Sequence, residues 1–191
     1  FKHLNHFQND IEINYKNNEI KNISKNNFFQ WKVILAHTGL DSGTGSRIYK
    51  IKDYIDDENF FITYGDGVGN INIRNLLEFH KKHKKIMTMT SVRPPSRFGE
   101  ITIKKDKVVK FEEKPQTKMG RINGGFFVCN KKIFDYMNSD EGLSLEFDCL
   151  KALSKDGQLM NFSHDDFWMP MDTHREHKIL NDLWKKNKKF F

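Results

Sequence analysis

The chain has 191 residues, with 32 Lys and Arg against 25 Asp and Glu, a formal net charge of +7 at pH 7 and an isoelectric point near 9.3. This length can bury one substantial core, and we expect one domain over residues 1–191 with its core at 31–186. No apolar run reaches the roughly 18 to 20 residues of a membrane span, and we see no secretory leader, so we expect a soluble, cytoplasmic protein without a membrane partner. The two cysteines, Cys129 and Cys149, occur in unrelated settings and predict neither a disulfide framework nor a cysteine zinc site.

The positive charge is compatible with an anionic partner, either nucleic acid or a phosphorylated small molecule. Lysines cluster at 81–85, 104–110 and 185–189, where we expect a helix end, a hairpin and a terminal tail. Such clusters are usually solvated faces. Since no recognition motif accompanies them, we expect no nucleic-acid partner.

The first half of the chain alternates strand and helix patterns. Ile11, Ile13 and Tyr15 alternate with polar residues as in a half-buried strand, and 17–27 predicts a loop. The next predicted elements are a strand at 33–36, a short helix carrying Ile48, Ile51 and Ile55, a strand at 60–64, a helix capped by Asn72 and a strand at 86–92. This order predicts an α/β fold with a doubly wound, mixed sheet.

The second half predicts a different arrangement. Strands at 100–103 and 108–111 flank a polar turn, as in a hairpin. The remaining predicted elements are a strand at 125–129, helices near 133–137 and 146–153, a strand at 159–162, a loop at 167–172 and a helix from Thr173.

The first candidate site is Gly65-Asp66-Gly67, which directly follows an apolar strand. Ligands of open α/β sheets bind outside the carboxyl ends of the strands. Glycine lets a phosphate approach the backbone, and a carboxylate is a ligand for a hard divalent cation. The alternative is a plain Asp-Gly turn.

The second candidate is Glu113-Lys114-Pro115, at the exit of a strand that the proline stops. Lys114 carries a compact charge suited to a phosphate oxygen, and Glu113 can accept hydrogen bonds from sugar hydroxyls. The alternative is a solvated strand end.

Two further patterns lie downstream. Asn123 precedes paired glycines and an aromatic strand, which predicts a close approach to the backbone, or else a bulge or tight turn. Asp172 lies at a strand-to-helix junction before Thr173 and Glu176, which have the spacing of a capping box. Asp172 therefore either belongs to the helix cap or completes a cation site with Asp66.

Taken together, seven motifs resemble the sugar-1-phosphate nucleotidyltransferases, and within that family the glucose-1-phosphate cytidylyltransferases. The motifs lie at 38–39 with 44–47, 63–68, 97–99, 113–115, 122–128, 167–168 and 170–173. The resemblance covers about residues 31–186 and implies the nucleotide-diphospho-sugar transferase variant of the α/β fold.

The resemblance also implies roles for individual residues. Asp66 and Asp172 would hold Mg²⁺ against the nucleotide phosphates, Lys114 would neutralise a phosphate, and Arg47 would approach the nucleotide. The implied sugar contacts are Gly65, Gly99, Glu113, Asn123, Gly124 and Glu146.

The implied reaction transfers a cytidylyl group from CTP to glucose 1-phosphate for surface-polysaccharide (O-antigen) synthesis, in a homo-oligomer. Another nucleotide or phosphorylated substrate is the open alternative. The family opens with a strand and a glycine-rich loop that wraps the triphosphate, and the chain has no counterpart of either. We therefore expect a partial domain, either a fragment of a complete enzyme or an inactive truncated remnant.

Overall fold

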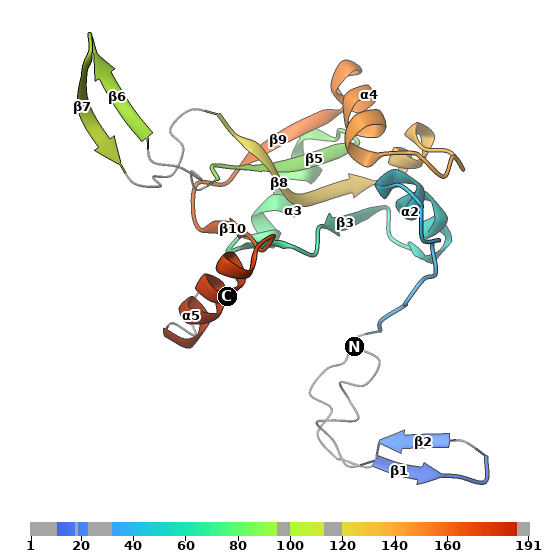
Figure 1. Ribbon diagram of the computed structural model, residues 1–191. Coiled ribbons are helices and arrows are strands. Elements are labelled where there is room, and N and C mark those ends of the chain that lie inside the picture. The colour runs from blue at the N-terminus through green and yellow to red at the C-terminus, as the bar shows by residue number, and fades with distance from the viewer. Residues whose placement is uncertain (1–10, 18, 23–31, 95–99, 113–119, 187–191) are drawn as a thin grey trace. The chain divides into compact units, whose positions relative to one another are not determined.

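The computed structural model describes residues 11–17, 19–22, 32–94, 100–112 and 120–186, and the chain divides into two compact units, Phe1–His37 and Thr38–Phe191. In the first unit, β1 (Ile11–Asn14) and β2 (Glu19–Asn22) form an antiparallel hairpin (Figure 1). β1 confirms the first predicted strand. The prediction of a loop at 17–27 is wrong over β2. This segment has a weak side-chain pattern of its own and is a strand because its backbone pairs with β1.

The strand predicted at 33–36 is also wrong. Residues 32–39 form neither helix nor strand, and Leu35 is 70% exposed. An apolar run becomes a strand only when a neighbour satisfies its backbone N–H and C=O groups. None of the described strands pairs with this segment.

The second unit is built on a four-stranded sheet with the order β3-β8-β5-β9. The strands are β3 (Asn59–Thr63), β5 (Met87–Val92), β8 (Ile122–Asn130) and β9 (Leu159–Ser163). β8 runs antiparallel to both of its neighbours, whereas β5 and β9 are parallel. This mixed sheet confirms the predicted fold class, and all four strands lie where the sequence predicts them.

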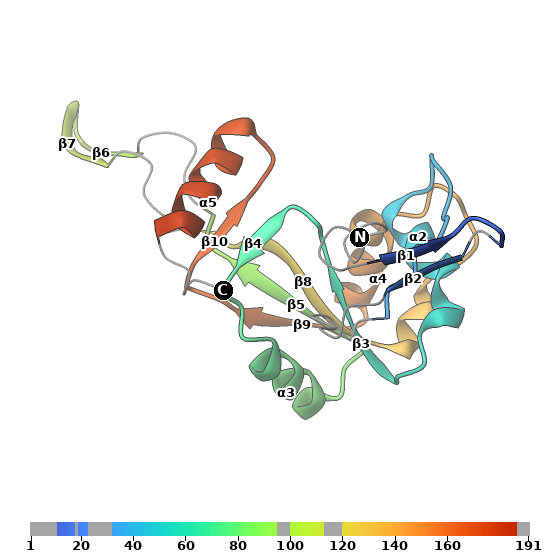
Figure 2. The same cartoon turned by 90° about the horizontal axis from the view of Figure 1, so that it is seen from below.

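Helices cover both faces of this sheet. α3 (Ile73–His83) covers one face, and α2 (Thr44–Lys50) and α4 (Leu150–Lys155) cover the other, while α5 (His174–Lys186) is the last described helix. Phe127 and Cys129 of β8 point into a core with Leu153 of α4, while Val128 between them packs with Leu76 of α3. Figure 2 shows α3 and α4 on opposite sides of the sheet.

Two predicted helices differ in type from an ordinary α-helix. The segment near 133–137 is a 3₁₀-helix, η2 (Lys131–Tyr136), and the helix at 146–153 begins as a π-turn, η3 (Leu145–Cys149), before α4. A 3₁₀-turn, η1 (Lys52–Tyr54), follows α2. The predicted cap of α3 is confirmed, because Asn72 Oδ1 accepts a hydrogen bond from the Asn75 N–H at 2.9 Å.

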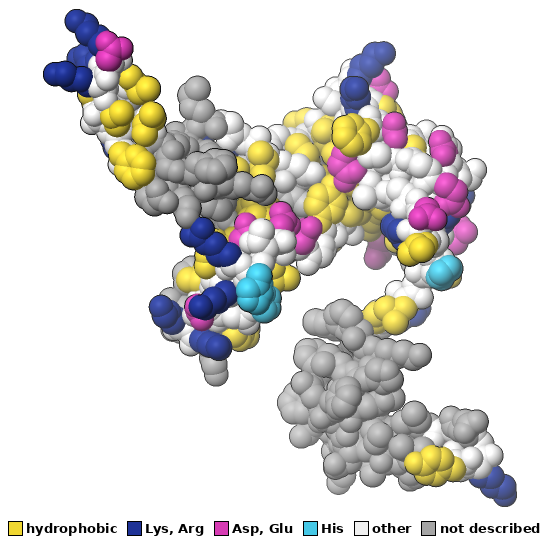
Figure 3. All heavy atoms as spheres, in the orientation of Figure 1, with side chains coloured by type: hydrophobic (Ala, Val, Ile, Leu, Met, Phe, Trp, Pro, Cys, Tyr) yellow, Lys and Arg dark blue, Asp and Glu magenta, His cyan; other side chains and the backbone are white. Residues whose placement is uncertain are grey.

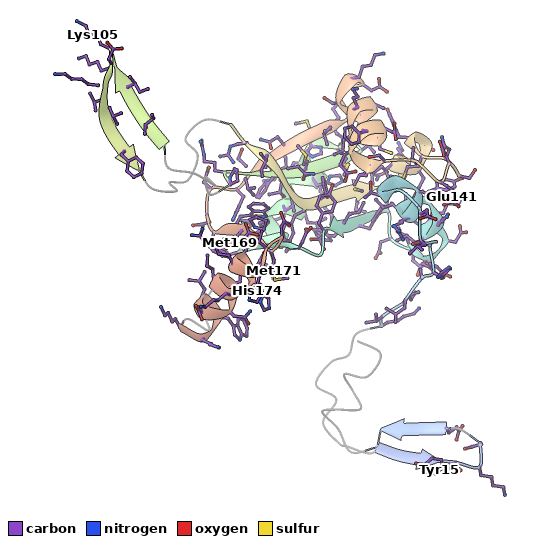
Figure 4. All side chains as sticks on the ribbon, viewed as in Figure 1. Tyr15, Lys105, Glu141, Met169, Met171 and His174 are labelled. Atoms are coloured by element: carbon purple, nitrogen blue, oxygen red, sulfur yellow. The ribbon has the colours of Figure 1, made fainter. Side chains whose placement is uncertain are left out.

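Two small ladders complete the second unit. β6 (Glu100–Lys104) and β7 (Lys107–Glu112) form the predicted hairpin, with Lys105 at its turn (Figure 4). β4 (Gly67–Gly69) and β10 (Trp168–Pro170) pair in antiparallel fashion. The loop predicted at 167–172 is therefore wrong over β10, whose three residues form a strand only because β4 lies beside them.

Candidate active site

Asp66 lies between the carboxyl end of β3 and the short strand β4. The β4–β10 ladder pairs Gly67 with Pro170, and one step further the Met171 N–H donates to the Asp66 carbonyl at 2.7 Å. Asp172 follows directly, so the ladder brings the two predicted metal-binding aspartates to the same end. Both residues are exposed. Figure 3 shows acidic side chains gathered beside the start of α5.

The hydrogen bonds at the start of α5 show which side chain caps this helix. Glu176 Oε2 accepts from the Thr173 N–H at 2.9 Å, and the Glu176 N–H donates to Thr173 Oγ1 at 3.2 Å, which is the predicted capping box. Asp172 adds its backbone N–H to Glu176 at 3.0 Å. Thr173 therefore supplies the capping side chain. Figure 4 places Met171 and His174 at this junction.

A hydrogen-bonded chain of side chains lies on the β8 side of Asp66. The Tyr64 hydroxyl donates to Glu146 Oε1 and accepts from Asn123 Nδ2 at 3.3 Å. Asn123 Oδ1 accepts from the Gly125 N–H at 2.9 Å, so the Asn123 amide is fixed at both ends. Asn123 and Glu146, both predicted sugar contacts, are thus joined through Tyr64.

Glu146 is held on its second oxygen as well. Its Oε2 accepts from Thr44 Oγ1 at 2.7 Å and from Ser144 Oγ at 3.0 Å. Partial burial raises the pKa of Glu146, but the hydrogen bonds from Tyr64, Thr44 and Ser144 outweigh burial and leave this pKa below its usual value. Glu146 is therefore a carboxylate at neutral pH.

Tyr64 is the neutral donor in this pair. Burial first, and then the Glu146 carboxylate and the Asp66 charge, raise the pKa of Tyr64 well above its ordinary value. The hydroxyl therefore keeps its proton at every physiological pH. The contribution of Asp66 also shows that its charge acts on the same group as Glu146.

The glycines at 124 and 125 are required by the protein's own packing. Gly125 has φ +77°, and a Cβ there would lie 2.8 Å from Tyr64 Cδ2. A Cβ at Gly124 would lie 2.7 Å from Val92 Cγ1, and Trp168 Nε1 donates to the Gly124 carbonyl at 2.9 Å. The β5–β8 register shifts here, which confirms the bulge that was the simpler alternative.

Gly65 is different from these glycines. A Cβ there would meet no described atom within 4 Å, so the protein's packing does not demand glycine at this position. The backbone beside Asp66 is open to an approaching group. This is the property expected where a phosphate or sugar must come close to the main chain.

The Arg47 guanidinium is engaged with its own loop. It donates to Thr38 Oγ1 at 2.8 Å, to the Gly39 carbonyl at 2.9 Å and to the Leu40 carbonyl at 2.9 Å. Lys50 braces the same loop through Thr38 and an ion pair of 2.6 Å with Glu141, a residue that Figure 4 shows near α2. Arg47 therefore orders this loop, and its nucleotide contact stays a prediction.

Three predicted site residues, Gly99, Glu113 and Lys114, lie outside the described residues. The structure adds three that sequence patterns did not single out, namely Tyr64, Thr44 and Trp168. Each contacts a predicted residue from a distant part of the chain. Only the presence of Thr44, Tyr64 and Trp168 within three of the seven motifs pointed toward them.

The two aspartates suit Mg²⁺, which is commonly held by one or two carboxylates together with substrate phosphates and waters. Within the described ranges, no group of three or more His, Cys, Asp or Glu side chains forms a metal site complete in itself. Asp66 and Asp172 are hard oxygen donors at one open edge. They therefore fit a cation that the substrate helps to bind.

The mixed sheet of the second unit is also found in solved structures. The crystal structure of HddC from Yersinia pseudotuberculosis has a similar fold, with a TM-score of 0.62, 21% identity, and coverage of 84% of this chain and 70% of that one. Residues 6–184 match the nucleotidyl transferase family, and the chain belongs to this family.

Two relatives are much more similar in sequence. The glucose-1-phosphate cytidylyltransferase of Salmonella typhimurium is 43% identical over 159 residues, which are 83% of this chain and 62% of that protein. The Bacillus subtilis protein named probable glucose-1-phosphate cytidylyltransferase is 40% identical, over 82% of this chain and 61% of that protein. The chain thus spans about six tenths of the length of these relatives. None of its described helices is long and apolar enough to cross a membrane.

Proposed function

We propose that this chain contributes the sugar-phosphate side of an active site that transfers a cytidylyl group from CTP to glucose 1-phosphate. The observation that carries the proposal is the β4–β10 ladder, which brings Asp66 and Asp172 to one edge beside the linked Asn123, Tyr64 and Glu146. The 43% identity to a glucose-1-phosphate cytidylyltransferase favours cytidylyl over other nucleotidyl groups.

In the proposed reaction, a phosphate oxygen of glucose 1-phosphate forms a bond to the α-phosphorus of CTP. The bond from that phosphorus to the bridging β-phosphate oxygen breaks, and pyrophosphate leaves with its electron pair. No proton needs to move, so the protein's task is to position the substrates and balance charge. A Mg²⁺ ion held by Asp66 and Asp172 would neutralise charge on the phosphates.

The residues around Tyr64 orient the sugar in this proposal. Glu146 is an ionised acceptor for a sugar hydroxyl, and its three hydrogen bonds fix its direction before the sugar arrives. Asn123 is similarly fixed by Tyr64 and Gly125. Preorganised polar groups of this kind select a substrate, since a mismatched hydroxyl leaves them without a partner.

The test is pyrophosphate release from CTP and glucose 1-phosphate with Mg²⁺, together with calorimetric titration of glucose 1-phosphate. Asp66→Asn should lower the rate by about 100-fold or more, since it removes a charge from the metal site. Asp182→Asn, an exposed change on α5, serves as the control and should have no effect.

Undiminished release by the Asp66→Asn variant would refute the metal assignment. Faster release from UTP, GTP or dTTP than from CTP would point to the alternative, a transferase for another nucleotide. Binding of glucose 1-phosphate without any release would identify a sugar-phosphate-binding remnant.

A further inference from the structure

A pocket lies at the end of the sheet opposite the candidate active site. β3 begins there at Asn59 and β8 ends there at Asn130, whereas Asp66 and Asn123 lie at the other ends of these strands. This pocket, which we call the Asn59 pocket, has a volume of about 300 Å³ and reaches the end of α3. This volume is at the lower end of the range for pockets that bind small molecules.

A chain of hydrogen bonds, which we call the relay, runs from Lys85 through two histidines to Asn59 on the wall of the Asn59 pocket. The Lys85 N–H donates to His83 Nδ1 at 2.9 Å, so neutral His83 carries its proton on Nε2 and donates it to Thr88 Oγ1 at 2.7 Å. The Thr88 hydroxyl then donates to His80 Nδ1 at 2.9 Å. Neutral His80 is left with its proton on Nε2, which donates to Asn59 Oδ1 at 3.2 Å.

Both histidines are neutral at physiological pH, as the relay requires. Burial, and then the neighbouring His83, lowers the pKa of His80 to about 4. Burial also lowers the pKa of His83. The tautomers derived from the hydrogen bonds therefore describe the protein near pH 7.

The relay sets the orientation of the Asn59 amide. Asn59 Oδ1 accepts from His80 Nε2 and from Asn130 Nδ2 at 3.3 Å, so its acceptor is used twice. Among the described residues, Asn59 Nδ2 has no hydrogen-bond partner. The Asn59 Nδ2 group is therefore an available hydrogen-bond donor on a residue that lines the pocket.

The charged side chains that line the Asn59 pocket are mostly positive. Lys81, Lys84, Lys85 and Lys132 line the pocket, and none of them forms an ion pair within the part of the chain that the structure describes. The single carboxylate of the lining, Glu58, accepts from Asn130 Nδ2 at 3.1 Å. Four lysines and one fixed amide donor thus line the pocket together with one engaged carboxylate. The lysine cluster at 81–85 is exposed, as expected of a solvated face, and also lines a pocket.

We propose that the Asn59 pocket is a second binding site, separate from the candidate active site, for the phosphate group of a small phosphorylated metabolite. Phosphate oxygens accept from ammonium and amide donors but offer nothing to a carboxylate, which matches a donor-rich lining. The donors come from β3, from α3 with the turn after it, and from η2, three separate elements that the fold holds together.

The test uses inorganic pyrophosphate as the probe, in a Mg²⁺-free buffer, followed by ¹H–¹⁵N NMR on the labelled chain. The side-chain amide signals of Asn59 and Asn130 should move saturably. Lys81→Glu with Lys132→Glu should raise the dissociation constant at least about tenfold, since attraction is replaced by repulsion on two walls. Lys151→Glu with Lys155→Glu on α4 changes the net charge equally and should leave the dissociation constant within about twofold.

Asn59→Asp is the sharpest variant. It keeps an oxygen for His80 and Asn130 and replaces only the free donor with a second carboxylate oxygen, so binding of pyrophosphate should be lost. The proposal is overturned if the Asn59 and Asn130 signals do not move, if Asn59→Asp binds normally, or if the α4 pair weakens binding as much as the pocket pair. It is also overturned if the Asn123 side-chain amide signal moves at a lower probe concentration than the signals of Asn59 and Asn130, which would locate the probe in the candidate active site. Of these results, only the last bears on the proposed transfer reaction, because pyrophosphate is the product of that reaction.

Discussion

Replacement of Tyr64 by Phe removes one oxygen and tests the chain of groups around Glu146. The ring packing against Phe127 and Gly125 stays, while the hydrogen bonds to Glu146 and from Asn123 are lost. A hydrogen bond to a charged partner contributes about 1.5–3 kcal/mol to stability. Glu146 is only half-buried and keeps Thr44 and Ser144 on its other oxygen, so we expect a loss of about 1–2 kcal/mol at pH 7.

The loss should depend on pH in a defined direction. The pKa of Glu146 in the folded protein lies below its ordinary value of 4.5, so its stabilising contribution is present above pH 4.5 and disappears as the pH falls through the folded pKa. Tyr64 supplies part of that shift. The difference in the free energy of unfolding between the two proteins should therefore be largest at pH 6–7 and shrink at about pH 3.

Urea unfolding at both pH values measures these differences. Tyr136→Phe is the matched control, because its hydroxyl contacts Asp156 Oδ2 at 3.0 Å on the surface, and it should leave the unfolding midpoint at pH 7 unchanged. The reasoning about Glu146 is refuted if Tyr64→Phe costs no more than Tyr136→Phe at pH 7, or if its cost is the same at pH 3.

Two further predictions concern backbone strain and a buried imidazole. Gly125→Ala should destabilise the protein by about 1–3 kcal/mol in urea unfolding, because φ is +77° and the new Cβ would lie 2.8 Å from the Tyr64 ring. Gly142→Ala is the control, because its new Cβ would make only an ordinary contact of 3.6 Å with Asp140 Oδ1. His80 has a folded pKa of about 4 against an ordinary 6.5, so the unfolded chain binds the extra proton first and stability should fall as the pH drops from 6.5 to 4. His80→Gln should flatten this part of the stability profile, and an unchanged slope would show that His80 is not the group responsible.

The elements predicted correctly are those whose signals are local. β3, β5, β8 and β9 carry apolar residues in short runs or in alternation with small polar residues, so their side chains alone indicate a strand. The cap of α3 and the capping box of α5 join groups three residues apart, so a short stretch of sequence contains both partners. The errors lie at 33–36, β2 and β10, where the presence or absence of a pairing strand, rather than the local pattern, decides the structure.

The candidate site divides in the same way. The sequence motifs singled out Asp66, Asn123 and Asp172 as candidates, because a functional group on a tight turn usually has glycine or proline close to it in the sequence. The partners Tyr64, Thr44 and Trp168 were not predicted, because each meets its target across a large separation in the chain. Side-chain type limits what such residues can bond to, but it does not say which distant group will be near.

Local residue patterns were enough to predict the α/β class, the strands of the main sheet and the candidate acidic residues, since periodicity and turn chemistry are properties of neighbouring residues. The pairing of β4 with β10, which brings Asp66 to the same edge as Asp172, could be seen only in the folded chain. The fold also makes Glu146 an ionised group braced by Tyr64, and it brings the lysines at the end of α3 to the pocket that Asn59 lines. The reason is the same in each case: these relations join segments that only the folded chain brings together, and no local pattern encodes them.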